Sequence, residues 1–571
     1  MKNADPSAIR PGIERTTDMA LLVLFLAVAC VFAFANRFMM DDAYIGLRYA
    51  RHFAENRGLV WYPGSREYGY TNFLFTVLEG LLMKGGFAAE NAAFAISIPA
   101  YLFSIFLTFR IASTLHASLF VPAFCTLALT THLTFSAYAT GGLETSLQTC
   151  LVLSVYYVLI LWRQTGKSET LWAMALGSAA ALLTRLDSAF LLLPAYGGLA
   201  SGLANEVQCH RRSGSSGTIW LLALAGIPTL AVVGLLAFCG ATYGQMLPNT
   251  FYAKVSIQRP GDWGIHYLAY YLRAQAGTPL MLLVWAAGCL LYTKRDAKRL
   301  ATAFLLAAPI ALWIVYILYI GGDFMEYRLL VPILPFFYLL TGGAILDVIA
   351  SSKARVLLFA TMCIGNFTQY RFLGGKVFFS QAGVSTALLD EWVTTGPINW
   401  AATGQALHAF FYTGNGSDVK IATDAAGAIP FYSDLPTIDE YGLNTRDVLT
   451  TGKKREFAPG HMRHAGADYL QAQQVNLIID LPAYVCTKDE SEICTHGSIS
   501  PAFNGPRMML KQLPIVLVPL EHDCYLMSYY LNRHPLIEEL LRRGILIPFP
   551  NGEAEFVCGS REWVHTKDRW H

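Results

Sequence analysis

Residues 19–42 read MALLVLFLAVACVFAFANRFMMDD, an apolar run that ends at two adjacent aspartates, Asp41 and Asp42. A membrane-spanning helix needs roughly 20 apolar residues, and the run Met19–Phe38 is long enough. It is too long for the core of a signal peptide and has no convincing small-residue cleavage site, so we interpret it as a retained helix. The sequence therefore predicts a polar site at the mouth of a membrane helix.

Composition extends this interpretation to most of the chain. Of the 571 residues, 54% are apolar and 14% are charged, whereas soluble domains carry about 25% charged residues. The net charge of +2 gives no indication of nucleic-acid binding. Apolar runs predict about eleven membrane spans: Met19–Phe38, Ala92–Ile111, Leu119–Tyr138, Leu143–Leu161, Leu171–Leu183, Ala189–Leu203, Ile219–Cys239, Pro279–Tyr292, Ala301–Ile320, Leu329–Ile349 and Val356–Phe367.

Basic residues of the short loops decide the predicted topology, because cytoplasmic loops are enriched in Lys and Arg. Lys2, Arg10 and Arg15 precede the first span. With eleven spans, the other basic loops fall on that same side: Arg163, Lys167, Arg211, Arg212, Lys294, Arg295, Lys298, Arg299, Lys353 and Arg355. A twelfth span over Asn72–Lys84 would invert every later loop, so we interpret this run as a helix in the outer interface. The prediction is a multi-pass protein of the bacterial inner membrane with a periplasmic site.

Two parts of the chain are predicted, a transmembrane module over residues 1–375 and a soluble periplasmic α/β domain over residues 376–571. The second part has no run of membrane length. Short β-like runs at Val419–Ala422, Asn476–Asp480 and Pro514–Leu517 alternate in it with helical stretches. Either this domain helps to bind the acceptor or it only stabilises the bundle, and both interpretations stay open.

Four cysteines fall in the C-terminal part: Cys486, Cys494, Cys524 and Cys558. No zinc-like spacing is present, and an even number of cysteines outside the cytoplasm indicates disulfides. Four cysteines permit three pairings, among which we favour Cys486 with Cys494.

The outer loops carry two kinds of charged residue. In a pair of adjacent carboxylates such as Asp41 and Asp42, like charge raises the pKa of one of them, which suits a general base, although Asp is also a common helix cap. Arg185, Lys254 and Arg328 come from three separate outer loops at helix edges. Cations at such edges either anchor the protein at the interface or bind a lipid phosphate, which arginine can hold with two hydrogen bonds. Because cations are disfavoured on the outer side, we favour the phosphate site.

An ordered set of motifs resembles the C-type (GT-C fold) glycosyltransferases. The likeness runs from about Phe38 to Pro335 and is in particular to the terminal β-(1→2)-arabinofuranosyltransferases of mycobacterial cell-wall assembly and their proteobacterial relatives. The motifs are Asp-Asp-Ala-Tyr-Ile, Gly-Leu-Val-Trp-Tyr-Pro-Gly, Gly-Tyr-Thr-Asn-Phe, Gly-Leu-Glu-Thr, Thr-Arg-Leu-Asp, Leu-Pro-Asn-Thr-Phe-Tyr-Ala-Lys and Gly-Gly-Asp-Phe-Met. The family usually has Thr-Arg-Pro-Glu around the arginine, so Leu186-Asp187 is a departure from its pattern.

The resemblance implies an inverting transfer of a sugar from a polyprenyl-phosphate donor to an acceptor hydroxyl on the periplasmic face. D-Arabinofuranose is the sugar it favours, and related transferases use mannose or aminoarabinose. Asp41 would be the base, with Asp42 orienting it or the sugar, and Arg328, Lys254 and Arg185 would stabilise the leaving phosphate. The predicted sugar and acceptor contacts are Tyr44, Trp61, Tyr70, Glu144, Asn249, Tyr252 and Asp323, although the aromatic ones could equally form an interfacial belt. Pilin or another glycoprotein, lipopolysaccharide and cell-wall arabinan remain open as acceptors.

No cofactor is firmly predicted. A divalent cation could bind the hard oxygen ligands Asp41, Asp42, Glu144 and Asp323. His461 and His464 have a spacing that zinc can use, without a further ligand nearby in sequence. The rival function is a transporter or flippase of lipid-linked sugars, which would need neither the acid pair nor a large external domain. Transporters often contain repeated halves, and we find no internal repeat.

Overall fold

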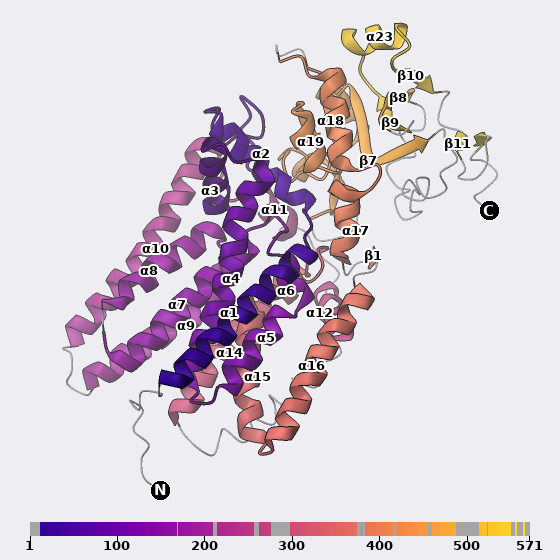
Figure 1. The fold of residues 1–571 in the computed structure, drawn as a ribbon. Coiled ribbons are helices and arrows are strands. Elements are labelled where there is room, and N and C mark those ends of the chain that lie inside the picture. Colours follow the sequence, from indigo (N-terminus) through magenta and orange to yellow (C-terminus); the bar gives the residue numbers. More distant parts are fainter. Residues whose placement is uncertain are drawn as a thin grey trace.

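The protein consists of a bundle of long helices with a mixed β-sheet at one end (Figure 1). The structure is a computed structural model that describes residues 12–167, 169–208, 214–255, 262–275, 297–373, 378–379, 383–414, 418–454, 460–486, 513–521, 524–549, 554–556 and 563–565. The predicted boundary between residues 375 and 376 lies outside the described residues and stays a prediction.

The bundle is formed by α1 (Gly12–Ala35), α4 (Ala89–Leu115), α5 (Phe120–Thr130), α7 (Thr145–Thr165), α8 (Thr170–Thr184), α9 (Ser188–Gln208), α10 (Gly214–Tyr243), α14 (Ala297–Ile320), α15 (Leu334–Val348) and α16 (Ser352–Leu373). Ten of the eleven predicted spans overlap these helices, and the remaining one, Pro279–Tyr292, lies outside the described residues. Leu119–Tyr138 is not one continuous helix. It breaks after Thr130, and α6 (Leu133–Ala137) begins with the His132 side chain accepting a hydrogen bond from the Phe135 N–H.

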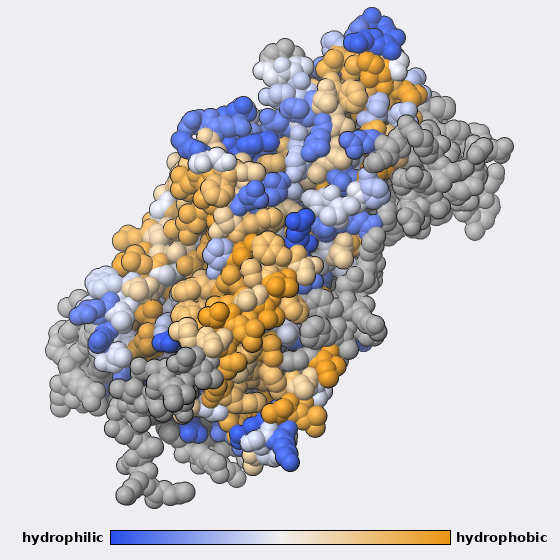
Figure 2. All heavy atoms as spheres, in the orientation of Figure 1, coloured by the Kyte–Doolittle hydropathy of each residue, from blue (hydrophilic) through white to orange (hydrophobic). Residues whose placement is uncertain are grey.

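Six helices in the described part of the chain are long and apolar enough to cross a membrane: Asp18–Ala35, Ala89–Leu115, Thr145–Thr165, Leu222–Tyr243, Arg299–Ile320 and Arg328–Val348. Large apolar side chains on the outside of the bundle have no protein cover, among them Leu230 at 71% and Phe304 at 73% exposure. On the face that Figure 2 shows, apolar residues form a broad band over the helices. Soluble monomers rarely expose so large an apolar surface, so this band is the face that lies in lipid. The membrane character predicted from composition is confirmed.

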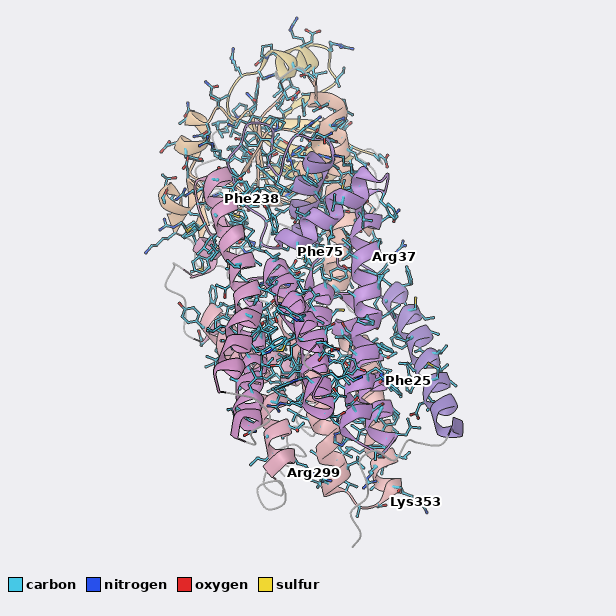
Figure 3. All side chains as sticks on the ribbon, turned by 90° about the vertical axis from the view of Figure 1, so that its left-hand side faces the viewer. Phe25, Arg37, Phe75, Phe238, Arg299 and Lys353 are labelled. Atoms are coloured by element: carbon cyan, nitrogen blue, oxygen red, sulfur yellow. The ribbon has the colours of Figure 1, made fainter. Side chains whose placement is uncertain are left out.

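Short helices close the end of the bundle that adjoins the sheet (Figure 1). They are α2 (Asp41–Ala54), α3 (Phe73–Lys84), α11 (Asn249–Val255), α12 (Trp263–Ala274) and the 3₁₀ helix η1 (Arg328–Ile333). The run predicted as an interfacial helix is α3, which has 12 residues. A helix of that length rises about 18 Å, too little to cross a hydrocarbon core of about 30 Å. At the opposite end of the bundle lie the basic residues Arg299 and Lys353 (Figure 3).

Six strands form the sheet in the order β10-β8-β9-β7-β3-β4. Their bounds are β3 (Ile421–Thr423), β4 (Thr437–Asp439), β7 (Leu477–Cys486), β8 (Ile515–Pro519), β9 (Cys524–Tyr530) and β10 (Ile547–Phe549). β3 pairs in parallel with both β4 and β7, while β7, β9, β8 and β10 pair antiparallel. The three predicted β-like runs overlap β3, β7 and β8. The α/β character predicted for this part is confirmed.

Helices α18 (Trp400–Phe411) and α23 (Pro535–Arg542) contribute to the core on one side of this sheet, around Leu407, Ile421 and Val518. We call the described residues from 400 to 549 the sheet region. The remaining short elements are α17 (Thr386–Asp390), the π-helix η2 (Glu391–Thr395), α19 (Ala428–Ser433), α20 (Val448–Thr451), α21 (Ala467–Ala472), β1 (Phe378–Phe379), β2 (Gly383–Val384), β5 (Lys453–Lys454), β6 (Arg463–His464), β11 (Ala554–Phe556) and β12 (Trp563–His565).

One of the four C-terminal cysteines is seen in a disulfide. Cys524 is disulfide-bonded, and the residue directly opposite it in the antiparallel register of β7 and β9 is Cys486. Opposed residues on such strands lie within the distance that a disulfide requires. The side chain of Cys486 lies outside the described residues, so the predicted pairing of Cys486 with Cys494 stays a prediction. Cys494 and Cys558 lie outside the described residues.

Candidate active site

A cavity of about 180 Å³ opens at the end of the bundle that adjoins the sheet region. Residues far apart in sequence line it, from α2, the turn between α8 and α9, α11, α14 and η1. Its charged lining residues are Asp42, Glu144, Arg185, Asp187 and Arg328, and apolar side chains such as Leu183 and Phe251 complete the wall. The predicted acidic and basic residues of separate loops therefore meet in one place.

The two adjacent aspartates at the start of α2 point to different surroundings. Asp42 is half-buried and lines the cavity. Asp41 is buried, and its two carboxylate oxygens accept hydrogen bonds from the backbone N–H groups of Gly427 at 3.0 Å and Ala428 at 2.7 Å. Consecutive residues of a helix do not face the same side. Asp41 is therefore a poor candidate for the base, contrary to our preference from the sequence, and Asp42 is the aspartate that lines the cavity.

Burial also sets the ionisation of Asp41. It raises the pKa of that carboxyl to about 7, although the two N–H donors act in the opposite direction. The contact requires glycine at position 427, because a Cβ there would lie 1.9 Å from the carbonyl oxygen of Asp41. The start of α19 is thus in direct contact with Asp41.

A network of ion pairs holds Arg185 at the cavity wall. Its guanidinium donates to Glu144 Oε1 at 2.5 Å and, through Nε, to Asp187 Oδ1 at 2.9 Å. Burial alone would raise the pKa of Glu144, but the neighbouring guanidinium outweighs it and the pKa is lowered. Asn72 donates to Glu144 at 2.9 Å, and the Tyr316 hydroxyl donates to Asp187 at 3.0 Å. Asp187, the departure from the family motif, therefore fixes the orientation of the arginine.

Arg328 has spare capacity for an anionic ligand. Its Nη2 donates to Asp323 Oδ2 at 2.5 Å, and the side chain is buried. Among the described residues, its Nε–H has no hydrogen-bond partner. A buried donor without a partner is costly, so a phosphate oxygen entering the cavity would satisfy it.

Several predicted sugar contacts serve instead to join the bundle to the sheet region. The Trp61 Nε1–H donates to the carbonyl oxygen of Thr437 at 3.2 Å. The Tyr44 hydroxyl donates to Glu90 and lies 3.4 Å from that of Tyr432. Neither Tyr44 nor Trp61 lines the cavity. Both expectations are corrected, because the sheet region covers these rings and takes them from solvent.

The same junction contains a fully buried arginine that sequence reasoning missed. Arg48 donates to the carbonyl oxygens of Pro430 at 2.9 Å and Leu435 at 2.8 Å, and its guanidinium stacks on the Trp61 ring. It lies three residues beyond the Asp-Asp-Ala-Tyr-Ile segment, and nothing in the sequence names the distant carbonyls as its partners.

Of the remaining predicted residues, one lines the cavity and the others lie on or beside α11. The Tyr70 ring lines the cavity, and its hydroxyl lies 3.0 Å from that of Tyr243. Asn249 is buried and donates to Glu67 at 3.1 Å. Tyr252 is half-buried on α11. Lys254 belongs to α11 as well, but its side chain lies outside the described residues.

The predicted cation ligands Asp41, Asp42, Glu144 and Asp323 do not come together. Asp41 faces α19, while Glu144 and Asp323 are occupied by the two arginines. In the described part of the chain, the group whose ligand atoms gather closely enough for a metal is a different one, in the sheet region. Sequence reasoning also missed Tyr316, which lies inside an apolar run and gives no signal there, and Asn72, which stands inside the Gly-Tyr-Thr-Asn-Phe motif.

Comparison with known proteins gives three kinds of match. A family model described as a domain of unknown function, DUF8728, matches residues 394–517. The terminal β-(1→2)-arabinofuranosyltransferase of Mycobacterium tuberculosis is 24% identical over 369 residues, which cover 58% of this chain. The chain spans 56% of the length of that relative.

Solved structures match over most of the chain. ArnT from Cupriavidus metallidurans in the apo state has a TM-score of 0.51 at 14% identity, covering 89% of this chain and 98% of ArnT. The same protein bound to undecaprenyl phosphate also has a TM-score of 0.51 at 14% identity, covering 89% of this chain and 97% of ArnT. The chain has the GT-C fold. In this GT-C chain, the cavity and the ion-pair network lie where the bundle meets the sheet region.

Proposed function

We propose that this GT-C protein is an inverting glycosyltransferase that moves D-arabinofuranose from a polyprenyl-phosphate donor to an acceptor hydroxyl. The observation that carries the proposal is the lining of one cavity by Asp42, Arg185 and Arg328. A carboxylate and two guanidinium groups in one wall fit a reaction that needs a base and a charged leaving group.

The chemistry is a single displacement. The acceptor hydroxyl gives its proton to the Asp42 carboxylate while its oxygen forms a bond to the anomeric carbon. The bond from that carbon to the phosphate oxygen breaks, and polyprenyl phosphate leaves with the electron pair. No acid is needed, because this leaving group is a weak base. A positioned base contributes roughly 10²–10⁴-fold to such a step.

Two arginines share the task of stabilising the phosphate. Arg328 offers its unpartnered Nε–H, whereas Arg185 is already paired with two carboxylates and acts mainly through its fixed position. We propose Lys254 as the third cation, because its neighbours Thr250 and Phe251 on α11 line the cavity. Without it, the carboxylates at this site would outnumber the cations.

The proposal places the cavity on the periplasmic side of the bacterial inner membrane. Its support is the charge distribution, since Arg299 and Lys353 stand at the opposite end of the bundle (Figure 3) and such residues gather in the cytoplasm. Cysteine-accessibility labelling on intact cells should modify a cysteine at position 447, in the exposed segment of Asp447, but not one at position 353. Modification of the second site alone would contradict this orientation.

The choice of sugar rests on the arabinofuranosyltransferase relative and on the motifs that resemble its family. The donor class is supported by ArnT, which has a solved structure bound to undecaprenyl phosphate. Transfer of mannose or aminoarabinose is the alternative within the fold. A flippase of lipid-linked sugars is the alternative outside it. Transport does not require the contact between α19 and Asp41, which argues against this alternative.

The direct test supplies purified full-length protein with labelled decaprenyl-phosphoryl arabinofuranose and a panel of pilin, lipopolysaccharide and arabinan acceptors. Parallel reactions contain the mannose and aminoarabinose donors. We expect transfer with inversion from the arabinose donor, lost in Asp42→Asn and kept in Asp262→Asn, a matched change at an exposed residue of the α12 N-cap. Transfer from the mannose or aminoarabinose donor instead would mean that the proposed sugar is wrong. Movement of intact donor across a vesicle membrane without sugar transfer would establish a flippase.

A further inference from the structure

A second group of ionisable residues lies inside the sheet region, away from the cavity. Asp424 directly follows β3, Glu440 directly follows β4, and Asp480 lies in β7. These three strands are parallel neighbours, so their carboxyl ends meet at one edge of the sheet. His464, from the short strand β6, completes the group, and all four residues are buried.

The four side chains converge on one point. His464 Nε2 lies 3.3 Å from Asp424 Oδ1, 3.5 Å from Glu440 Oε2 and 3.9 Å from Asp480 Oδ1. One ligand atom from each residue lies within 4.8 Å of all the others. Asp480 has a left-handed backbone, with φ 54°, at an irregularity in the register of β7. That uncommon conformation accompanies the placement of its carboxylate in the group.

Hydrogen bonds do not account for this convergence. Within the described residues, both carboxylate oxygens of Glu440, which is 1% exposed, lack a hydrogen-bond partner, and so does Asp424 Oδ1. For these two carboxylates, the described chain offers no lysine or arginine within ion-pair distance, only His464. One imidazole cannot balance three buried carboxylates, and unbalanced buried charge is strongly unfavourable, so a bound cation is the simplest way to satisfy them.

The imidazole is also oriented as a metal ligand would be. His464 Nδ1 lies 2.9 Å from the carbonyl oxygen of Ala465, and a carbonyl oxygen can only accept, so Nδ1 carries a proton. Nε2 is the atom that faces the carboxylates. Metal-binding histidines commonly donate their second N–H in this way. In the same manner the Tyr441 hydroxyl donates to Asp424 Oδ2 at 3.0 Å, which leaves Oδ1 directed at the centre.

We propose a binding site for one divalent metal ion, Zn²⁺ or Mn²⁺, formed by Asp424, Glu440, His464 and Asp480. The imidazole favours these ions over Ca²⁺ and Mg²⁺, which prefer ligand sets made entirely of oxygen. The site differs from the His-x-x-His arrangement considered from the sequence. His461 is not one of its ligands and packs its ring against Tyr441 and Phe324.

The site is connected to the aspartate pair by a few residues of backbone. Asp424 is followed by Ala425, Ala426 and Gly427, and the Gly427 N–H holds the carboxylate of Asp41. An ion that fixes Asp424 therefore fixes the segment on which α2 is seated. This role rests on the proposed function, whereas the metal site itself does not.

The test begins with metal analysis of full-length protein purified without added metal or chelator, and needs no sugar donor. We expect about one Zn²⁺ or Mn²⁺ per chain, and at least 10-fold less in Glu440→Gln and His464→Gln, since even changes to residues that only orient metal ligands weaken binding 10–100-fold. The matched control is Glu539→Gln, a surface carboxylate of α23 that should keep the metal.

A second measurement uses only the wild-type protein, so it does not depend on whether the variants fold. Wild-type protein is stripped with a chelator, and its thermal unfolding is followed on addition of Zn²⁺, Mn²⁺, Ca²⁺ or Mg²⁺. A rise in Tm with Zn²⁺ or Mn²⁺ supports the site, because an ion that binds only the folded state stabilises it. A wild-type chain that holds no more metal than the variants and shows no rise overturns the proposal, and a rise with Ca²⁺ or Mg²⁺ alone overturns its ion class. Loss of sugar transfer with intact metal binding would count against the proposed function only.

Discussion

The cavity at the end of the bundle and the buried group in the sheet region are both rich in carboxylates, yet they are neutralised in different ways. At the cavity, Glu144 and Asp323 each face an arginine, and in the described part of the chain the Nε–H of Arg328 has no hydrogen-bond partner. In the sheet region, Asp424 and Glu440 face a single imidazole and one another. The first arrangement is suited to an incoming anion and the second to an incoming cation. Carboxylates alone do not specify a ligand, because the cations beside them decide it.

The largest expected effect among changes outside the cavity comes from Gly427→Ala. The added Cβ would lie 1.9 Å from the Asp41 carbonyl oxygen, so α19 must move away from α2. We expect turnover to fall by about 10²-fold, because a shift of about 1 Å at a supporting position can cost that much. Gly226→Ala, where a Cβ meets nothing within 4 Å, is the control. Full activity in Gly427→Ala would show that the contact between α19 and α2 is not needed for the reaction.

A smaller effect is expected from Arg328→Gln, which tests whether the cavity binds an anion. A charge-assisted hydrogen bond is worth about 1.5–3 kcal/mol, so the donor Kd should rise by roughly 10–100-fold. Arg299→Gln removes the same charge at the far end of the bundle and should leave Kd unchanged (Figure 3). An unaltered Kd in Arg328→Gln would contradict the phosphate site.

The smallest expected effect is a gain in thermal stability, from Glu440→Gln in the sheet region. In metal-free protein, Glu440→Gln removes one of the buried carboxylates that repel each other, so the variant should unfold at a higher temperature than the wild type. A gain of about 1 kcal/mol raises Tm by roughly 2–4 °C in a domain of about 150–250 residues, so we expect a rise of that size or smaller here. With Zn²⁺ or Mn²⁺ in excess, the order should reverse. A variant that is less stable in both conditions would mean that Glu440 has a favourable partner of another kind.

The sequence predicts local features of this protein well, but not the contacts between its two parts. Apolar runs are local signals, so Met19–Phe38 and most later spans were placed from the chain alone, and the motifs brought Asp42, Arg185 and Arg328 to one site. The direction of each aspartate could not be predicted, because it depends on Gly427, which lies almost 400 residues away. Tyr44 and Trp61 were misassigned for the same reason, since their partners belong to the sheet region.

The proposed metal site is the clearest example of a feature that the sequence could not predict. Its residues are separated by 16, 24 and 16 positions and form no motif, and only the parallel pairing of β3, β4 and β7 brings three of them to one edge. Sequence reasoning singled out His464 but paired it with His461, its neighbour in the chain. The carboxylates that share its site are distant in sequence and become neighbours only through the sheet.

We propose that Asp42 acts on the substrate while Asp41 holds the two parts of the protein together. Asp42→Asn and Asp41→Asn should therefore be compared in turnover, donor Kd and Tm. We predict that Asp42→Asn loses roughly 10²–10⁴-fold in turnover with donor Kd and Tm nearly unchanged. Asp41→Asn should lower Tm, because an amide cannot accept two N–H donors with both of its polar atoms. Normal Tm and the full loss of turnover in Asp41→Asn, together with an active Asp42→Asn, would show that Asp41 is the base instead.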